Sequence, residues 1–198
     1  MNSPFFRIVE VLVRFVALNV LYLAVCVPLV TIPAATGALF AVARKTVQGR
    51  EPQVWPTFWH GFRGNWMQSS AVGGLSAVVA VVLWVDYRVV TVWHVLAIGH
   101  LALILFYALM LFAFATELSI FPMMVHMELK TRDVLLNALK LTTRRPGLTV
   151  VNLLALALLF YLCLHVPLLF AGFYFSVSAT FTYWIADKKF QQMAPADH

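Results

Sequence analysis

The sequence predicts an all-α membrane protein: a polytopic bundle of about six membrane segments, the second one short, with two cytoplasmic amphipathic helices. Its 198 residues are 62% hydrophobic and 11% charged, with a mean hydropathy of +0.87, whereas a soluble domain carries roughly 25% charged residues. The apolar residues also fall into runs near the ~20 residues that a helix needs to cross a bilayer. We therefore expect residues 1–198 to form a single integral membrane domain.

The first expected span covers residues 5–29 and ends at a proline-rich break. The run is longer than the apolar region of a signal peptide, so we expect an uncleaved span. Arg14 lies in its early turns and Asn19 near mid-depth. Proline removes a backbone donor and clashes with the preceding helical turn, so the helix should end here. Four residues define the break: Pro28, Thr31, Pro33 and Gly37.

Residues 34–48 predict a second, Ala-rich helix, and two arrangements of it remain open. Its apolar part of about twelve residues is ~18 Å long, too short to cross a bilayer alone. The extended segment Leu29–Ile32 would supply the missing depth if protein buries its backbone. The chain then has six membrane segments and a cytoplasmic N-terminus, the arrangement favoured here. Otherwise it has five, and the N-terminus lies outside.

The next segment predicts an amphipathic helix at the membrane surface. Its aromatic residues follow helical spacing and share one face: Trp55, Phe58, Trp59, Phe62 and Trp66. Polar residues, Arg63 among them, lie elsewhere on the helix. Aromatic rings with polar tips favour the headgroup layer, which indicates an interfacial helix. A buried core helix is the alternative.

Four more spans and a second amphipathic helix follow. Spans are expected at 67–85 and from 93 to about 115, with the second helix continuing past a proline to residue 126. Residues 131–140 predict a capped amphipathic helix. Residues 148–187 are too long for one span, and the break at 164–167 predicts a tight hairpin. Small residues at four-residue spacing favour close helix packing in the first of these spans: Ser69, Gly73 and Ala77.

Charge distribution predicts the orientation. Residues 44–63 contain four basic and one acidic residue, and residues 128–145 contain five basic and two acidic, so each loop nets +3. Cytoplasmic loops of membrane proteins carry such an excess of lysine and arginine. Both loops and the C-terminus are therefore expected in the cytoplasm. Because the charge sits in short loops between apolar runs, nucleic-acid binding is excluded.

No known catalytic motif is visible in the sequence. It contains no Gly-x-Ser-x-Gly, no His-Glu-x-x-His and no phosphate-binding glycine loop. Cys26 and Cys163 lie inside apolar runs, where a free thiol behaves as a small core residue. We expect no enzyme activity, no cofactor and no metal site.

Polar groups at membrane depth are the candidate functional residues, because burying them in lipid is costly. Glu117 and Arg14 either pair within the bundle or lie at the headgroup level. Asn19 and Asn152 are expected to form interhelical hydrogen bonds rather than to bind a solute.

Several blocks of sequence resemble the YesL-like family of bacterial membrane proteins. The blocks are Asn19–Leu23, Pro28–Leu39, Phe58–Trp66, Phe121–Pro122, Asn137–Leu141 and Arg144–Gly147. Pro33 departs from the family pattern, in which a glycine is expected there. The resemblance implies a multi-pass protein of the bacterial cytoplasmic membrane. The family has no established activity, and its members often lie near genes for carbohydrate uptake and breakdown, which implies an accessory role.

Three hypotheses about function follow from the sequence. The first is a non-enzymatic accessory component of a membrane system such as carbohydrate uptake. The second is a small-solute transporter or channel in which the break at residues 28–37 lines the path, as broken helices do in many carriers. In the third, the amphipathic helices dock onto a soluble or ATPase partner, as in an ABC importer, although the permease loop motif is missing. The lipid bilayer is the one partner that all three share.

Overall fold

The computed structural model describes residues 4–93, 97–127 and 130–191, and within them every regular element is helical. The elements are α1 (Pro4–Val25), the 3₁₀ turn η1 (Leu29–Thr31), α2 (Ile32–Val47), α3 (Val54–Gly64), α4 (Trp66–Trp93), α5 (Ala97–His126), α6 (Thr131–Arg144), α7 (Pro146–His165), α8 (Pro167–Leu169), the π-helix η2 (Phe170–Tyr174) and α9 (Phe175–Gln191). The prediction of an all-α protein is confirmed.

Five stretches of the described chain are long and apolar enough to cross a membrane: Ile8–Val25, Trp66–Val89, Leu103–His126, Pro146–His165 and Pro167–Gln191. They correspond to five of the six segments expected from the sequence. The remaining one, α2, has 16 residues and does not reach this length.

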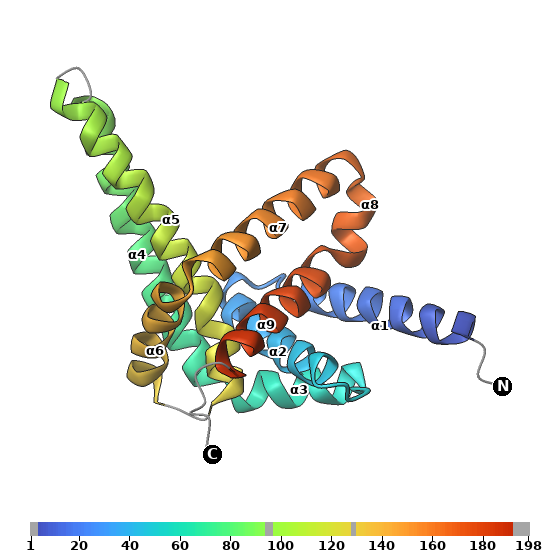
Figure 1. Cartoon of the computed structure of the whole chain (residues 1–198). Helices are drawn as coiled ribbons and strands as arrows, with labels where there is room; N and C mark the ends of the chain where they lie inside the picture. The colour runs from blue at the N-terminus through green and yellow to red at the C-terminus, as the bar shows by residue number, and fades with distance from the viewer. Residues whose placement is uncertain (1–3, 94–96, 128–129, 192–198) are drawn as a thin grey trace, which may run out of the picture.

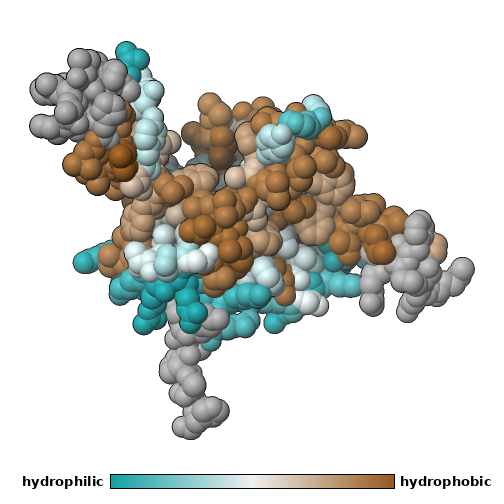
Figure 2. Space-filling view, turned by 45° about the horizontal axis from the view of Figure 1, so that its top comes forward, coloured by the Kyte–Doolittle hydropathy of each residue, from teal (hydrophilic) through white to brown (hydrophobic). Residues whose placement is uncertain are grey.

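Two hairpins diverge from a common base (Figure 1). The first hairpin is α4–α5, and the second runs from α7 through α8 and η2 to α9. The base consists of α2, α3 and α6 with the adjoining ends of α4, α5 and α9, and we call it the polar base. Figure 2 shows hydrophilic residues gathered along this base, while the hairpins and α1 present apolar surface. Side chains on the hairpins therefore suit lipid, and those on the base suit water or headgroups.

The predicted break after the first span is confirmed. α1 ends at Val25, four residues earlier than expected, and Thr31 closes the turn. Its hydroxyl donates to the carbonyls of Pro28 (2.6 Å) and Val25. Leu29 is 80% exposed, so the side chains of the turn face outward. These hydrogen bonds satisfy carbonyls that the end of a helix leaves without partners.

The short helix α2 forms the centre of the packing. It contacts α3, α4, α5 and α9, and half of its residues are buried: Ala34, Ala35, Gly37, Ala38, Leu39, Phe40, Val42 and Ala43. Close approach to α4 depends on glycines. A Cβ atom added at Gly73 would lie 2.1 Å from Pro33 Cγ, and one added at Gly37 would lie 2.6 Å from Ser69 Oγ. The predicted close packing of the small residues at 69 and 73 is thus confirmed, and α2 is the partner.

The second amphipathic helix packs as its pattern predicts. Val134, Ala138 and Leu141 of α6 are buried in one cluster with Met123 of α5 and Phe190 of α9. The helix starts at Thr131, but Lys130 is the N-cap and no side chain makes a capping hydrogen bond, so the predicted cap is wrong. Burial of the apolar face, rather than the cap, stabilises this helix.

The hairpin break near residue 165 is also confirmed. α7 ends at His165 and α8 begins at Pro167, where proline suits the first turn of a helix. The π-helix η2 that follows was not predicted. It interrupts the usual backbone hydrogen-bond pattern, and Asn19 of α1 forms hydrogen bonds to its backbone carbonyls.

Candidate functional site

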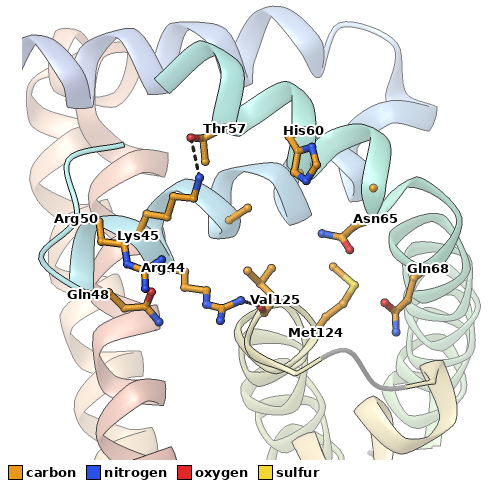
Figure 3. Close-up of a pocket in the computed structure, with 13 residues that line it drawn as sticks. Arg44, Lys45, Gln48, Arg50, Thr57, His60, Asn65, Gln68, Met124 and Val125 are labelled. Carbon is orange, nitrogen blue, oxygen red and sulfur yellow. Dashed lines mark hydrogen bonds between the residues drawn. The ribbon is translucent and has the colours of Figure 1, made fainter. Parts of the chain in front are cut away.

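A cavity of about 690 Å³ lies in the polar base, where four helices and one loop meet (Figure 3). The end of α2, the following loop, α3, the start of α4 and the end of α5 supply its lining. The lining residues are Ala41, Arg44, Lys45, Gln48, Arg50, Thr57, His60, Gly61, Gly64, Asn65, Gln68, Met124 and Val125. Its lining contains more polar side chains than the linings of the two apolar cavities of the hairpins.

A tight turn between α2 and α3 builds one side of the cavity. Gly49 has a φ of 71°, a conformation that side-chain-bearing residues rarely adopt. The turn reverses the chain, so α3 runs back along α2. A Cβ atom added at Gly61 would lie 2.8 Å from Ala41 Cβ, so only glycine allows this spacing. As a result Lys45 Nζ reaches Thr57 Oγ1 at 3.3 Å.

Arg44 connects α2 to the end of α5. Its guanidinium donates a hydrogen bond to the carbonyl of Val125. That carbonyl belongs to the last turn of α5, where helix carbonyls lack partners and the helix dipole favours a cation. The contact therefore both closes the cavity and stabilises the helix end.

The charge in this cavity of the polar base is positive, and we call it the basic cavity. Arg44, Lys45 and Arg50 line it, and no described carboxylate does. Within the described residues, the one ion pair joins Arg14 to Glu10, on a different helix. Other polar groups of the lining are amides, an imidazole and a hydroxyl. Such a set can bind an anion and form hydrogen bonds to its polar atoms.

Two further cavities are apolar. One, of about 470 Å³, lies among α1, α2, α5, α7 and α9, and the other, of about 420 Å³, lies between α4 and α5. Glu117 is the one charged residue in the lining of the second. Their apolar walls and their position on the hairpins suit lipid chains better than a polar solute.

The structure does not bring Arg14 and Glu117 together. Arg14 Nη2 instead lies 3.0 Å from Glu10 Oε1, one turn away on the same helix. Oppositely charged side chains four residues apart on a helix are neighbours, so this local pair forms first. α1 packs mainly on α2, α3, α9 and η2, whereas α5 packs mainly on α2, α4, α6 and α9. The suggested pair between Arg14 and Glu117 is wrong.

Asn19 attaches α1 to the π-helix. Its Nδ2 donates to the carbonyls of Phe170 (3.3 Å) and Ala171 (2.6 Å), and its Oδ1 accepts from the backbone N–H groups of Phe175 (2.9 Å) and Ser176 (3.2 Å). The side chain is fully buried. A single amide thus satisfies backbone groups where the helix changes its hydrogen-bond pattern.

Asn152 and one buried lysine join α7 to α9. Thr182 Oγ1 donates to Asn152 Oδ1 at 3.2 Å, so the expected interhelical roles of both asparagines are confirmed. Lys189 is also buried, and its Nζ donates to Thr149 Oγ1 at 2.8 Å. A buried Lys189 was not predicted, because a lysine pair at the end of a span is typical of exposed flanking residues.

The four residues that define the helix break line none of these three cavities, whereas Thr36, which lies between them, lines the apolar cavity of about 470 Å³. Gly37 and Pro33 face α4, and Thr31 bonds within the turn itself. The polar groups of the break are therefore used inside the protein.

The aromatic face of α3 is divided between core and surface. Phe58 is fully buried in the cluster around α2, whereas Trp55 is 63% exposed. Trp59, Phe62 and Trp66 are half-buried and contact one another edge to face, and Arg63 is exposed. The expectation that the whole face lies among headgroups is wrong for Phe58, because the alanines of α2 let α3 come close enough to bury it.

Comparison with known proteins decides the family. Residues 15–87 match a family model described as a protein of unknown function, DUF624. The chain is 31% identical over 168 residues to the uncharacterized protein YteU of Bacillus subtilis (strain 168), covering 81% of this chain and 73% of that protein. It is 30% identical over 152 residues to the uncharacterized protein YesL of the same organism, covering 74% and 70%. The chain belongs to the YesL-like family.

The resemblance noted in the sequence is therefore confirmed. No solved structure matches the chain significantly. The part of the YesL-like chain matched by the family model runs from α1 to α4. It includes every lining residue of the basic cavity except Met124 and Val125.

Proposed function

We propose that this protein is a non-enzymatic accessory component of a membrane system, such as carbohydrate uptake, and that it binds its partner at the polar base. The observation that carries the proposal is a second apolar stripe on α6. Leu136 is 45% exposed and Leu139 is 41% exposed, although the opposite face of the helix is already buried in the core. Folding of the chain does not require these two exposed leucines.

The surroundings of these leucines suit a protein partner. Arg132, Asp133 and Lys140 are exposed on the same helix, so charged side chains flank the two leucines. Exposed apolar residues rimmed by charge mark interaction sites on many proteins. An amphipathic helix at the end of a membrane bundle can lie in a groove of a soluble or membrane partner, such as an ABC importer.

The polar residues at membrane depth support an accessory role over transport. Asn19 and Asn152 bond to backbone or side-chain groups of other helices, and Arg14 pairs with Glu10. Pro33 and Gly37 of the break pack against α4. The two asparagines and the break hold helices together and Arg14 is paired within α1, so few polar groups remain to bind a solute or couple an ion.

The chemistry of the basic cavity supports a non-enzymatic role. Its described lining brings cations, amides, one imidazole and one hydroxyl, but no carboxylate and no thiol. Nucleophilic catalysis depends on a nucleophile that a neighbouring base activates, with a third group that orients the base. In this lining the candidate base is His60, and no lining carboxylate orients its imidazole.

Site-specific cross-linking tests the proposal. A photo-reactive amino acid replaces Leu136 or Leu139 on α6, and Leu158, which is exposed on α7, serves as the control. In native membranes, the α6 positions should give the same protein adduct and the α7 position should give lipid adducts. Lipid adducts alone at all three positions would contradict a partner at the polar base.

The carbohydrate part of the proposal needs a separate measurement. Cells that lack the protein should take up labelled oligosaccharides more slowly, and the intact gene should restore the rate. A gene carrying Leu136→Asp and Leu139→Asp should fail to restore it at equal protein level. Unchanged uptake in the deletion strain across the sugars that the cell imports would reject carbohydrate uptake while leaving the docking surface intact.

A further inference from the structure

The cations of the basic cavity have more hydrogen-bond donors than the protein uses. Among the described residues, Arg44 gives one of its five N–H donors, to the Val125 carbonyl, and Lys45 gives one of its three, to Thr57. Arg50 is exposed at the rim of the cavity. Three positive groups from one short stretch repel each other, and an anion between them lowers that repulsion. The remaining donors are therefore available to an anionic ligand.

Phosphate suits these donors better than a carboxylate. A guanidinium presents a planar pair of donors that matches two oxygens of a phosphate, and an ammonium acts as a compact point charge beside it. Two arginines and one lysine can compensate the two charges of a phosphate monoester. A phosphate group, as a monoester or a diester, offers four oxygens around one centre, whereas a carboxylate offers two.

The rest of the lining indicates a ligand larger than a bare ion. Its volume, about 690 Å³, falls in the range of ~300–1,000 Å³ typical of small-molecule sites. Opposite the cations, α3 and the start of α4 present His60, Asn65 and Gln68 (Figure 3). Amide and imidazole groups both donate and accept hydrogen bonds, which suits hydroxyl groups.

The position of the cavity makes it accessible from two sources. It lies in the polar base, and Figure 2 shows that the hydrophilic surface of this base adjoins the apolar hairpins. A soluble ligand can reach it from water, and a lipid headgroup can reach it from the membrane surface. Both sources share one chemistry, a phosphate that carries a hydroxylated body.

We propose that the basic cavity binds a phosphate-bearing polyol, presented either by a soluble phosphate monoester or by the headgroup of an anionic glycerophospholipid. The cations of α2 and its following loop hold the phosphate, and the polar groups of α3 and α4 hold the hydroxyls. This proposal is independent of the docking of a partner on α6, because the exposed leucines of α6 do not line the cavity.

Two binding measurements on the purified full-length protein test the proposal. In neutral detergent, glycerol 3-phosphate should raise the melting temperature, whereas glycerol or sodium chloride at matched ionic strength should not. By native mass spectrometry, phosphatidylglycerol should stay bound more than phosphatidylcholine. A response in the first measurement identifies a soluble ligand, and a response in the second alone identifies a headgroup.

Matched variants place the response in the cavity. Lys45→Gln and Arg50→Gln should each weaken binding by about tenfold, as expected for the loss of one charge-assisted hydrogen bond. Lys140→Gln is the control, because it removes the same charge from an exposed position on α6 that does not line the cavity. Arg50 is exposed in a loop, so its variant should fold even if the Lys45 variant does not.

Three results would overturn the proposal. One is the absence of a response to both glycerol 3-phosphate and phosphatidylglycerol. Another is an equal response to sodium chloride, which would show general screening of the positive charge. The third is a loss of binding in Lys140→Gln as large as that in Arg50→Gln, which would show nonspecific attraction to a basic surface.

Discussion

Replacing Asn19 by leucine should loosen the attachment of α1 to the second hairpin. The side chain of leucine is similar in size, so the change removes four hydrogen bonds without leaving a large cavity. Hydrogen bonds between membrane helices average ~0.6 kcal/mol and reach ~1.7. Four of them give about 2–4 kcal/mol, because the backbone groups of η2 and α9 that lose Asn19 recover part of the loss with other partners.

The melting temperature in detergent is the measurement. One kcal/mol corresponds to ~2–4 °C for a chain of this size, so Asn19→Leu should melt on the order of 5–15 °C lower. Asn152→Leu is the matched control, since Asn152 accepts one hydrogen bond, from Thr182. Its loss should be ~1–3 °C. Equal melting of the two variants would refute the assignment of a special role to Asn19.

Three further predictions follow from the packing and the charge pattern. Gly73→Ala should lower the free energy of unfolding by ~1–3 kcal/mol through overpacking against Pro33. Gly74→Ala should be neutral, since open space surrounds an added Cβ there. Equal melting temperatures of the two variants would contradict the tight contact at Gly73. In a chain without native cysteines, a membrane-impermeant thiol reagent should label Arg88→Cys in intact cells and Arg50→Cys only in opened cells; the reverse would overturn the expected orientation. Glu117→Gln should leave the melting temperature unchanged or raised, because no described residue forms an ion pair with this carboxylate; a drop of several degrees would reveal a charged partner.

Helix ends were predictable because proline acts locally. Pro28 and Pro167 lie at breaks that the sequence alone identified, within a few residues. The amphipathic face of α6 was also predictable, since helical periodicity places Val134, Ala138 and Leu141 on one side. These features depend on neighbours within a few turns.

Features that depend on distant contacts were not predictable. Twelve apolar residues fit a short span as well as a buried helix, and the close packing of α2 on α4 depends on Gly73, which is distant in sequence. The hydrogen bonds of Asn19 end on backbone groups of η2 and of the first turn of α9, and backbone groups carry no sequence signature. The basic cavity could not be predicted, because it forms only where the end of α5 meets the end of α2 through Arg44 and Val125.

The central place of α2 has a consequence for how the protein is made. α2 leaves the ribosome before α4, α5 and α9, which bury it. Because α2 is short, it has little tendency to stay in the bilayer by itself. Until the two hairpins are synthesised and pack on it, α2 can therefore contact only the helices α1 and α3. A nascent chain that stops before Phe175 lacks α9, which covers one side of α2. In such a chain the Ala-rich surface of α2 would be exposed, and a protease that degrades incomplete membrane proteins could recognise it.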